Sequence, residues 1–123
     1  MFTIKKEFYF SASHVIEGLP DSHPCGHLHG HNYIVELILA AELLDKTGFV
    51  VDYGDLQPFK DIIDNELDHR HLNDIIPGPT TAENLAYYLF QRAKAIWPQT
   101  VAVCVSETPR TWAEYRPSLS PKS

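Results

Sequence analysis

The sequence predicts an α+β domain in which an antiparallel sheet of four strands carries two helices on one face. Hydrophobic residues alternate with the period of a strand near both ends of the chain, and between these segments they repeat with the spacing of a helix. The predicted order is strand, strand, helix, helix, strand, strand. At 123 residues the chain has the size of one domain. We expect residues 1–117 to form that domain and residues 118–123 to be a frayed tail.

Two strands are predicted at the start of the chain. Alternation from Phe2 to Phe10 predicts a first strand that ends at His14, and a second strand is predicted from about His29 to Ala41. One face of the second strand is apolar: Tyr33, Val35, Leu37 and Leu39. The segment between the strands contains residues that break regular structure: Gly18, Pro20, Pro24 and Gly26. The simplest arrangement is a hairpin with a long connection.

Two helices are predicted next. Asp52 is expected to cap the first helix, whose buried face has helical spacing: Leu56, Phe59, Ile63 and Leu67. Thr80 or Thr81 is expected to start the second helix, with Glu83 at capping-box distance from Thr80. The predicted buried face of this helix consists of Leu85, Tyr88, Leu89 and Ile96. Pro98 is expected to end it.

Two short strands complete the predicted sheet, at about 101–107 and 111–116. Alternate residues of the first look buried: Val101, Val103 and Val105. Glu107 shares their face, so it is either an exposed strand end or an anchor for the donor groups of a ligand.

Charge and composition exclude several classes of function. Sixteen acidic and ten basic residues give a net charge of −6, and the basic residues are scattered, so nucleic-acid binding is not expected. No stretch reaches the roughly 18 apolar residues that cross a bilayer. Residues 1–10 look like a strand rather than a signal peptide. Cys25 and Cys104 are therefore expected to be reduced in a cytoplasmic protein, with Cys104 serving only as packing.

Histidine stands out from this ordinary composition. Five of the seven histidines lie within one short window: His14, His23, His27, His29 and His31. His29 and His31 project from one face of a strand, and the predicted hairpin places His14 opposite His29. Three neutral imidazoles without a fourth protein ligand are typical of a catalytic zinc site with one open position, although copper, nickel and iron also accept imidazole. His23 and His27 are alternative ligands, and single histidines more often belong to a surface or a core.

Other reactive side chains accompany this cluster. Cys25, four residues before His29, is either a fourth, structural zinc ligand or a thiolate that acts as a base or nucleophile. Asp68 and His69 are neighbours in a polar loop, where a carboxylate can orient an imidazole for acid–base chemistry. His71, in the same loop, is equally compatible with a solvated surface.

Six motifs occur together and in order: FSASH (10–14), CGHLHGHNY (25–33), VDYGDL (51–56), LDHRHLN (67–73), PTTAENLA (79–86) and VSET (105–108). This combination resembles the family of 6-pyruvoyl-tetrahydropterin and 6-carboxy-tetrahydropterin synthases, and the resemblance covers roughly residues 2–116. The resemblance implies the tunnelling fold (T-fold), in which each subunit contributes four antiparallel strands backed by two helices. Three subunits would close a barrel, and two trimers would form a homohexamer with active sites between subunits.

The resemblance also implies a metal and a catalytic thiol. The metal is Zn²⁺, and its ligands match His14, His29 and His31. Cys25 matches the catalytic cysteine, which favours a base over a fourth ligand. The resemblance assigns no role to three other histidines, His23, His27 and His71, and it leaves the residues that bind the triphosphate open.

Four further residues match the family's substrate site. Asp68 and His69 match an acid–base pair that reaches the zinc site of a neighbouring subunit. Glu107 matches the carboxylate that binds the amino and ring N–H groups of the pterin. Thr81 falls where the family lines the pterin pocket.

The substrate that the resemblance implies is 7,8-dihydroneopterin triphosphate. In CGHLHGH, three residues separate the cysteine from the final H-G-H, a spacing typical of the carboxy branch. That branch releases acetaldehyde and triphosphate and yields 6-carboxy-5,6,7,8-tetrahydropterin for queuosine and 7-deazapurine biosynthesis. The alternatives are a 6-pyruvoyl-tetrahydropterin synthase of the biopterin pathway and a non-catalytic homologue that binds metal and pterin. A generic zinc hydratase or hydrolase would leave Glu107 and the Asp-His pair unexplained.

Overall fold

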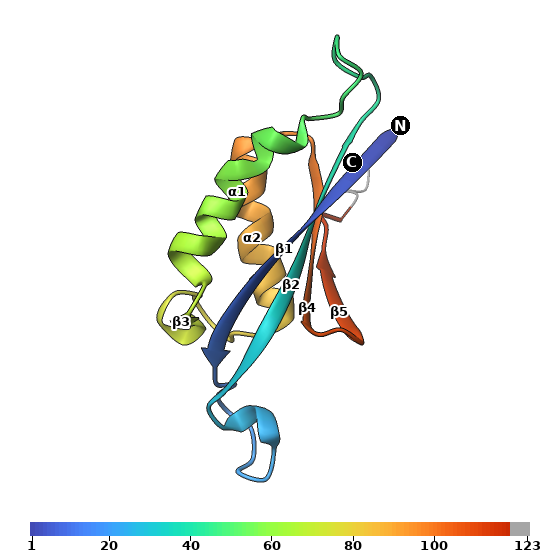
Figure 1. Cartoon of the computed structure of the whole chain (residues 1–123). Coiled ribbons are helices and arrows are strands. Elements are labelled where there is room, and N and C mark those ends of the chain that lie inside the picture. Colours follow the sequence, from blue (N-terminus) through green and yellow to red (C-terminus); the bar gives the residue numbers. More distant parts are fainter. Residues whose placement is uncertain (119–123) are drawn as a thin grey trace.

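Two long strands, β1 (Phe2–His14) and β2 (His29–Ala41), form the predicted antiparallel hairpin (Figure 1). They pair along their whole length in the computed structural model, which describes residues 1–118, and His14 lies opposite His29. Alternate residues of both strands are buried, as their pattern predicts: Phe8, Phe10, Tyr33, Val35, Leu37 and Leu39. The hairpin therefore supplies one wall of the core and carries three of the cluster's histidines at one end.

The sheet has five strands in the order β3-β1-β2-β4-β5, so the expectation of four antiparallel strands is wrong. β4 (Thr100–Thr108) and β5 (Thr111–Tyr115) lie close to the predicted bounds and are antiparallel. The additional strand β3 (Arg70–His71) lies in the loop between the helices and pairs in parallel with the free edge of β1. Its two residues satisfy backbone groups of β1 but are too few to produce an alternating pattern.

The first helix, α1 (Gln57–Ile62), lies between a 3₁₀ turn at Tyr53–Leu56 and a wider π turn at Ile63–Leu67. Asp52 caps the 3₁₀ turn by accepting a hydrogen bond from the Gly54 amide at 2.9 Å. All four predicted apolar positions are buried: Leu56, Phe59, Ile63 and Leu67. The helical periodicity therefore holds across all three turn types.

The second helix, α2 (Ala82–Ile96), begins at Thr81, whose hydroxyl accepts a hydrogen bond from the Asn84 amide. Thr81 rather than Thr80 is thus the N-cap. Leu85 and Leu89 are fully buried as predicted, but Ile96 is 43% exposed. The prediction is wrong at Ile96 because Trp97, the next residue, takes the buried position at this end of the helix.

Both helices cover the same face of the sheet, and the core lies between the two layers (Figure 1). The other face of the sheet is more polar, and there Lys5 pairs with Glu36 at 3.8 Å. Cys104 alternates with the core residues Val103 and Val105 and so faces away from the helices. Its thiol donates to Glu114, and burial raises its pKa to about 12. Such a thiol stays protonated, as expected for packing.

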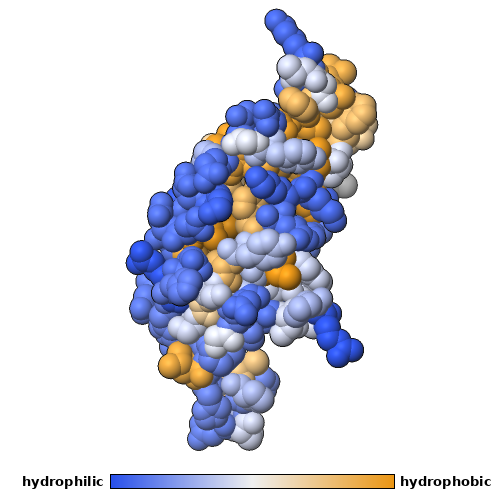
Figure 2. Space-filling view, in the orientation of Figure 1, coloured by the Kyte–Doolittle hydropathy of each residue, from blue (hydrophilic) through white to orange (hydrophobic). Residues whose placement is uncertain are grey.

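Figure 2 shows a largely hydrophilic face, with apolar residues gathered at the end that holds the N-terminus and the β2–α1 connection in Figure 1. The exposed hydrophobic side chains include Met1, Phe2, Leu43, Leu44 and Phe49. The histidine-bearing end of the hairpin lies at the opposite end of the molecule. Within residues 1–118, no helix is both long and apolar enough to cross a membrane. The expected frayed tail falls on residues 119–123, outside the described part, apart from residue 118.

Candidate metal centre and adjoining pocket

Three histidine side chains meet at the end of the β1–β2 hairpin. His14 and His29 are register partners, and His31 follows two residues after His29 on the same face. The candidate ligand nitrogens all lie within 4.8 Å of one another, and the ring centroids are 4.5–5.1 Å apart. One metal ion could therefore contact all three rings.

Backbone carbonyls orient two of these rings. His14 Nδ1 donates to the carbonyl of Thr80 at 2.8 Å, and His29 Nδ1 donates to the carbonyl of His27 at 2.6 Å. In the neutral rings, Nε2 then carries the lone pair that a metal requires. His14 is only 1% exposed, its Nε2 has no hydrogen-bond partner, and burial lowers its pKa. A buried, unpaired ring nitrogen among imidazoles fits a cation such as Zn²⁺.

Thr80 belongs to this site although the sequence pattern does not reveal it. Its carbonyl fixes His14, and its hydroxyl lies 3.3 Å from the same ring nitrogen. The sequence contained one indirect signal for this role, the two adjacent threonines before α2. Only one of them can be the N-cap of the helix. Because Thr81 is the N-cap, Thr80 is available to contact His14.

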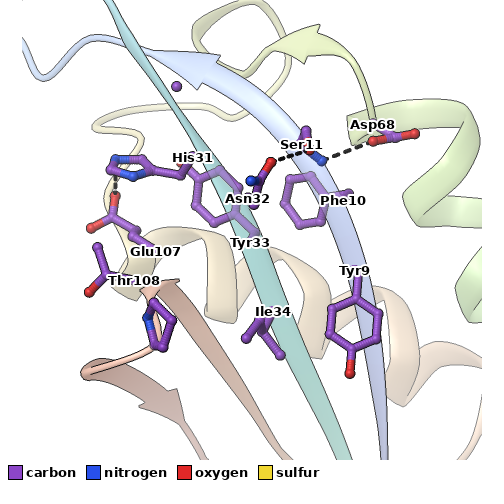
Figure 3. A pocket seen from close by; sticks show the side chains of 12 residues that line it. Tyr9, Phe10, Ser11, His31, Asn32, Tyr33, Ile34, Asp68, Glu107 and Thr108 are labelled. Atoms are coloured by element: carbon purple, nitrogen blue, oxygen red, sulfur yellow. Dashed lines mark hydrogen bonds and ion pairs between the residues drawn. The ribbon is translucent and has the colours of Figure 1, made fainter.

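Glu107 reaches the histidines from β4. Between two pairs of β4–β5 partners, Val105–Ala113 and Thr108–Thr111, β4 contains one extra residue, which is a β-bulge. From this bulge, Glu107 Oε2 lies 3.6 Å from His31 Nε2 (Figure 3). The same oxygen lies 3.4 Å from His14 Nε2. Of the two interpretations that the sequence left open, the geometry favours a site carboxylate over an exposed strand end.

Tyr33 is a second residue that the motif analysis did not assign to the site. Its ring stacks on Phe10 with centroids 4.7 Å apart and lies 5.5 Å from the His31 ring. The side chain is 1% exposed, and its hydroxyl has no hydrogen-bond partner. Burial, together with the charge of Glu107, raises the pKa of this phenol. The period of two that places His29 and His31 on one face predicts the same face for Tyr33.

An open cavity of about 720 Å³ adjoins the metal centre. Its lining residues include His31, Tyr33, Asp68, Glu107 and Thr108, most of them shown in Figure 3. Aromatic walls combined with a few polar groups are typical of a site for a flat heterocycle. The cavity therefore has the size and chemistry to bind a ligand next to the metal.

Asp68 and His69 form the predicted pair, with Asp68 Oδ2 2.9 Å from His69 Nδ1. Asp68 Oδ1 accepts a hydrogen bond from the Ser11 amide, which is the main reason that its pKa is lowered; His69 contributes as well. His69 has φ of +59°, a left-handed conformation that costs a residue with a Cβ about 1–3 kcal/mol. Its side chain is 82% exposed, so the imidazole extends away from the surface of its own chain.

Cys25 and Thr81 lie outside the histidine cluster. Cys25 is a free, partly exposed thiol in the 3₁₀ turn Pro24–Gly26. Within residues 1–118, the side chains grouped around the candidate metal position are the three histidines, without this thiol. The Thr81 hydroxyl is engaged in capping α2.

The remaining histidines have partners of their own. His23 Nδ1 accepts from the Cys25 amide at 3.1 Å, and His27 Nε2 lies 2.6 Å from the Asp21 carbonyl. His71 Nδ1 lies 3.0 Å from Ser13 Oγ. The alternative in which His23 or His27 replaces a strand histidine as a ligand is therefore disfavoured.

Comparison with known proteins places these features in a family. A profile described as 6-pyruvoyl tetrahydropterin synthase matches residues 3–118. A 6-carboxy-5,6,7,8-tetrahydropterin synthase of Synechocystis sp. is 34% identical over 132 residues, 98% of each chain. A dihydroneopterin monophosphate aldolase of Pyrococcus furiosus is 39% identical over 74 residues, 60% of this chain and 62% of the relative. The structure of the Caenorhabditis elegans 6-pyruvoyl tetrahydropterin synthase matches with a TM-score of 0.83 and 28% identity, over 95% of this chain and 96% of that one.

Proposed function

The chain belongs to the 6-pyruvoyl tetrahydropterin synthase family, and we propose that it converts 7,8-dihydroneopterin triphosphate and water to 6-carboxy-5,6,7,8-tetrahydropterin, with release of acetaldehyde and triphosphate. One observation carries the proposal: three histidines and a carboxylate converge beside a cavity large enough for a pterin. The relative from Synechocystis, similar along nearly the whole chain, is named for this product. The pathway that we propose is queuosine and 7-deazapurine biosynthesis.

In this proposal His14, His29 and His31 hold Zn²⁺. When bound, the ion would act as a Lewis acid toward the side-chain hydroxyls of the substrate and make the neighbouring C–H protons more acidic. The carbonyls of Thr80 and His27 keep the His14 and His29 rings in the required tautomer.

Recognition of the pterin is assigned to Glu107. A carboxylate has two acceptor oxygens, which match the adjacent amino and ring N–H donors of a pterin. Glu107 and Tyr33 line the same cavity, so the heterocycle would lie against an aromatic wall with its polar edge toward the carboxylate. Thr81, at the start of α2, is proposed to line the pocket.

Proton transfer is assigned to Cys25 and to the Asp68–His69 pair. Cys25 as thiolate would remove protons from the substrate side chain. Asp68 is ionised at neutral pH, and the hydrogen bond from the Ser11 amide lowers its pKa further, so its carboxylate can orient His69 and stabilise the imidazolium. His69 would then return the proton.

We further propose a cytoplasmic homohexamer in which each site is completed by a neighbouring subunit. The outward imidazole of His69 and the position of Cys25 away from the cluster support this arrangement. The strands at the two ends of the sheet, β3 and β5, would pair across subunits to close a barrel. The expected ligand is a small pterin triphosphate.

Product analysis tests the reaction. Purified, zinc-loaded protein is incubated with 7,8-dihydroneopterin triphosphate, and acetaldehyde and pterins are measured by mass spectrometry. Acetaldehyde together with the carboxy product supports the proposal. A pyruvoyl product without acetaldehyde would instead indicate the biopterin branch. A parallel incubation with dihydroneopterin monophosphate tests the activity that the name of the Pyrococcus relative describes.

Absence of turnover by a metal-loaded oligomer would favour a non-catalytic homologue that binds metal and pterin. If the wild type is active, a mixing experiment tests whether each site is shared between subunits. His29→Ala and His69→Ala chains, each inactive alone, should recover activity when refolded together, because some interfaces then combine an intact zinc site with an intact His69.

A further inference from the structure

We propose that Arg70 and His71, the two residues of β3, bind the phosphate chain of the substrate in a subsite that begins beside His31. This assignment rests on the proposed function, which supplies a pterin that carries a triphosphate on its side chain. The chain as a whole has a net charge of −6 and repels a polyanion. A phosphorylated substrate therefore requires a local group of donors with positive charge.

A second cavity, of about 470 Å³, adjoins the cavity assigned to the pterin. The two cavities share four lining residues: Ser11, Gly30, His31 and Asn32. Because His31 is also one of the three candidate metal ligands, the metal position lies near the boundary between the cavities. A ligand with its heterocycle in the first cavity and its side chain at the metal would extend into the second.

The lining of the second cavity suits an anion. Within residues 1–118 it contains no aspartate or glutamate, and Arg70 is the only lysine or arginine in the lining of either cavity. The Ser11 hydroxyl donates to Asn32 Oδ1 at 2.6 Å, so the amide nitrogen of Asn32 is available to donate to a ligand (Figure 3). A further cavity of about 650 Å³ also contains Arg70, but its lining includes Asp68 and Asp74, whose carboxylates would repel a phosphate.

The pairing of β3 with β1 fixes both residues at this cavity. Arg70 lies beside Ala12 and His71 beside Ser13 in the parallel register. His71 Nδ1 is 3.0 Å from Ser13 Oγ, a contact that orients the ring. When the serine hydroxyl donates to Nδ1, the neutral ring carries its hydrogen on Nε2, which can donate to a phosphate oxygen.

The Arg70 guanidinium is exposed and has no acidic partner. Within residues 1–118 no carboxylate lies within ion-pair distance of it, whereas Arg92 and Arg116 each pair with a glutamate. A guanidinium donates two parallel hydrogen bonds to the oxygens of one phosphate, which a lysine cannot do. Arg70 is therefore free to bind a phosphate without giving up a contact of the folded chain.

Selection for a phosphorylated side chain would follow. The pterin cavity and the metal contact parts that neopterin and its triphosphate have in common. Only the subsite at β3 distinguishes the two molecules, so the preference for the phosphorylated one should depend on Arg70.

Fluorescence titration tests the subsite, because pterins fluoresce. The zinc-loaded protein is titrated with two fully oxidised pterins, neopterin and neopterin triphosphate, and the ratio of their Kd values measures the contribution of the phosphates. The wild type is compared with Arg70→Gln. Lys46→Gln is the matched control, because it removes the same charge from an exposed position in the β2–α1 connection, at the opposite end of the molecule. Circular dichroism verifies that each variant is folded.

The wild type should bind neopterin triphosphate more tightly than neopterin. Arg70→Gln should lower this preference about tenfold or more, because a charged donor to the phosphates is lost, and should leave the Kd of neopterin unchanged. Lys46→Gln should keep the wild-type preference. An unchanged preference in Arg70→Gln, or an equal loss in Lys46→Gln, would overturn the inference while leaving the pterin site intact. A wild type that binds neither pterin would overturn it together with the proposed function.

Discussion

Ser11 and Asp68 are joined by a hydrogen bond of 2.9 Å from the backbone amide of Ser11 to the Asp68 carboxylate, across 57 residues of sequence. The carbonyl of Ser11 also accepts the amide of His69 at 2.6 Å. Both bonds attach the proposed acid–base pair to β1, the strand that ends in His14. The edge of β1 therefore determines where the pair lies and stabilises the left-handed backbone of His69.

Asp68→Asn tests this attachment through its pH dependence. The bond from Ser11 lowers the pKa of Asp68 below the unfolded value of about 3.9. Its contribution to stability is thus complete above that value and is lost as the pH falls through the folded pKa. The variant should lose about 1 kcal/mol at pH 7, because a charged acceptor becomes a neutral one. Urea unfolding should show this difference shrinking toward pH 3, whereas an equal difference at both pH values would contradict it.

Tyr33→Phe should separate stability from activity. A buried hydroxyl without a partner is unfavourable, so its removal should leave the metal-free protein as stable as the wild type, or up to about 1 kcal/mol more stable. If the hydroxyl contacts substrate, KM should rise. Thermal unfolding and steady-state kinetics measure both effects, with the exposed Tyr87→Phe as control. A loss of stability greater than 1 kcal/mol would show that the hydroxyl has a partner.

Removal of a strand histidine should remove the metal. His29→Ala is expected to lose bound zinc, while His27→Ala should retain it, because His27 supports His29 through its backbone carbonyl only. Zinc at 100 times its Kd stabilises a folded protein by about 2.7 kcal/mol, so a chelator should lower the Tm of the wild type but not of His29→Ala. Elemental analysis and calorimetry provide the measurements. Undiminished zinc in His29→Ala would contradict the ligand assignment.

Cys25→Ala should abolish turnover and leave the zinc content unchanged, because the thiol lies outside the histidine cluster. Cys104→Ala should remain active. A thiol reagent at pH 8 should modify Cys25, which is partly exposed, and spare Cys104, whose pKa of about 12 keeps it protonated. Loss of zinc from Cys25→Ala would instead identify Cys25 as a ligand.

Two substitutions in α2 test its corrected buried face. Leu89→Ala, at a fully buried position, should cost about 2–5 kcal/mol in the free energy of unfolding. Ile96→Ala should cost less than about 1 kcal/mol because Ile96 is only partly buried. Urea denaturation of both variants measures the difference. Similar losses would mean that Ile96 is buried, for example by another subunit.

Much of the fold follows from periodicity. Alternation locates β1 and β2, and the pairing of these strands brings His14 opposite His29. Helical spacing identifies the buried side of α1 without error. The strand β3 was missed because it exists only through its pairing with β1, a long-range contact that two residues cannot signal.

In the candidate site, too, the sequence predicted the residues placed by local strand geometry but not the contacts that depend on long-range pairing. The three histidines follow from strand geometry, but the approach of Glu107 depends on one extra residue in β4, which the alternation in VSET does not reveal. The contact of Thr80 with His14 depends on how the start of α2 meets the end of β1. Both features arise where elements distant in sequence meet.

The closeness of the histidines in the sequence has a consequence for the order of assembly during folding. All three belong to one hairpin of two neighbouring strands, so their contacts are more local than the pairing of β2 with β4. Glu107 arrives from β4, more than seventy residues later in the chain, and only after the long-range pairing of β2 with β4. We therefore expect the hairpin to bind the ion while the C-terminal half is still unfolded, and the docking of β4 to bring Glu107 to the site afterwards.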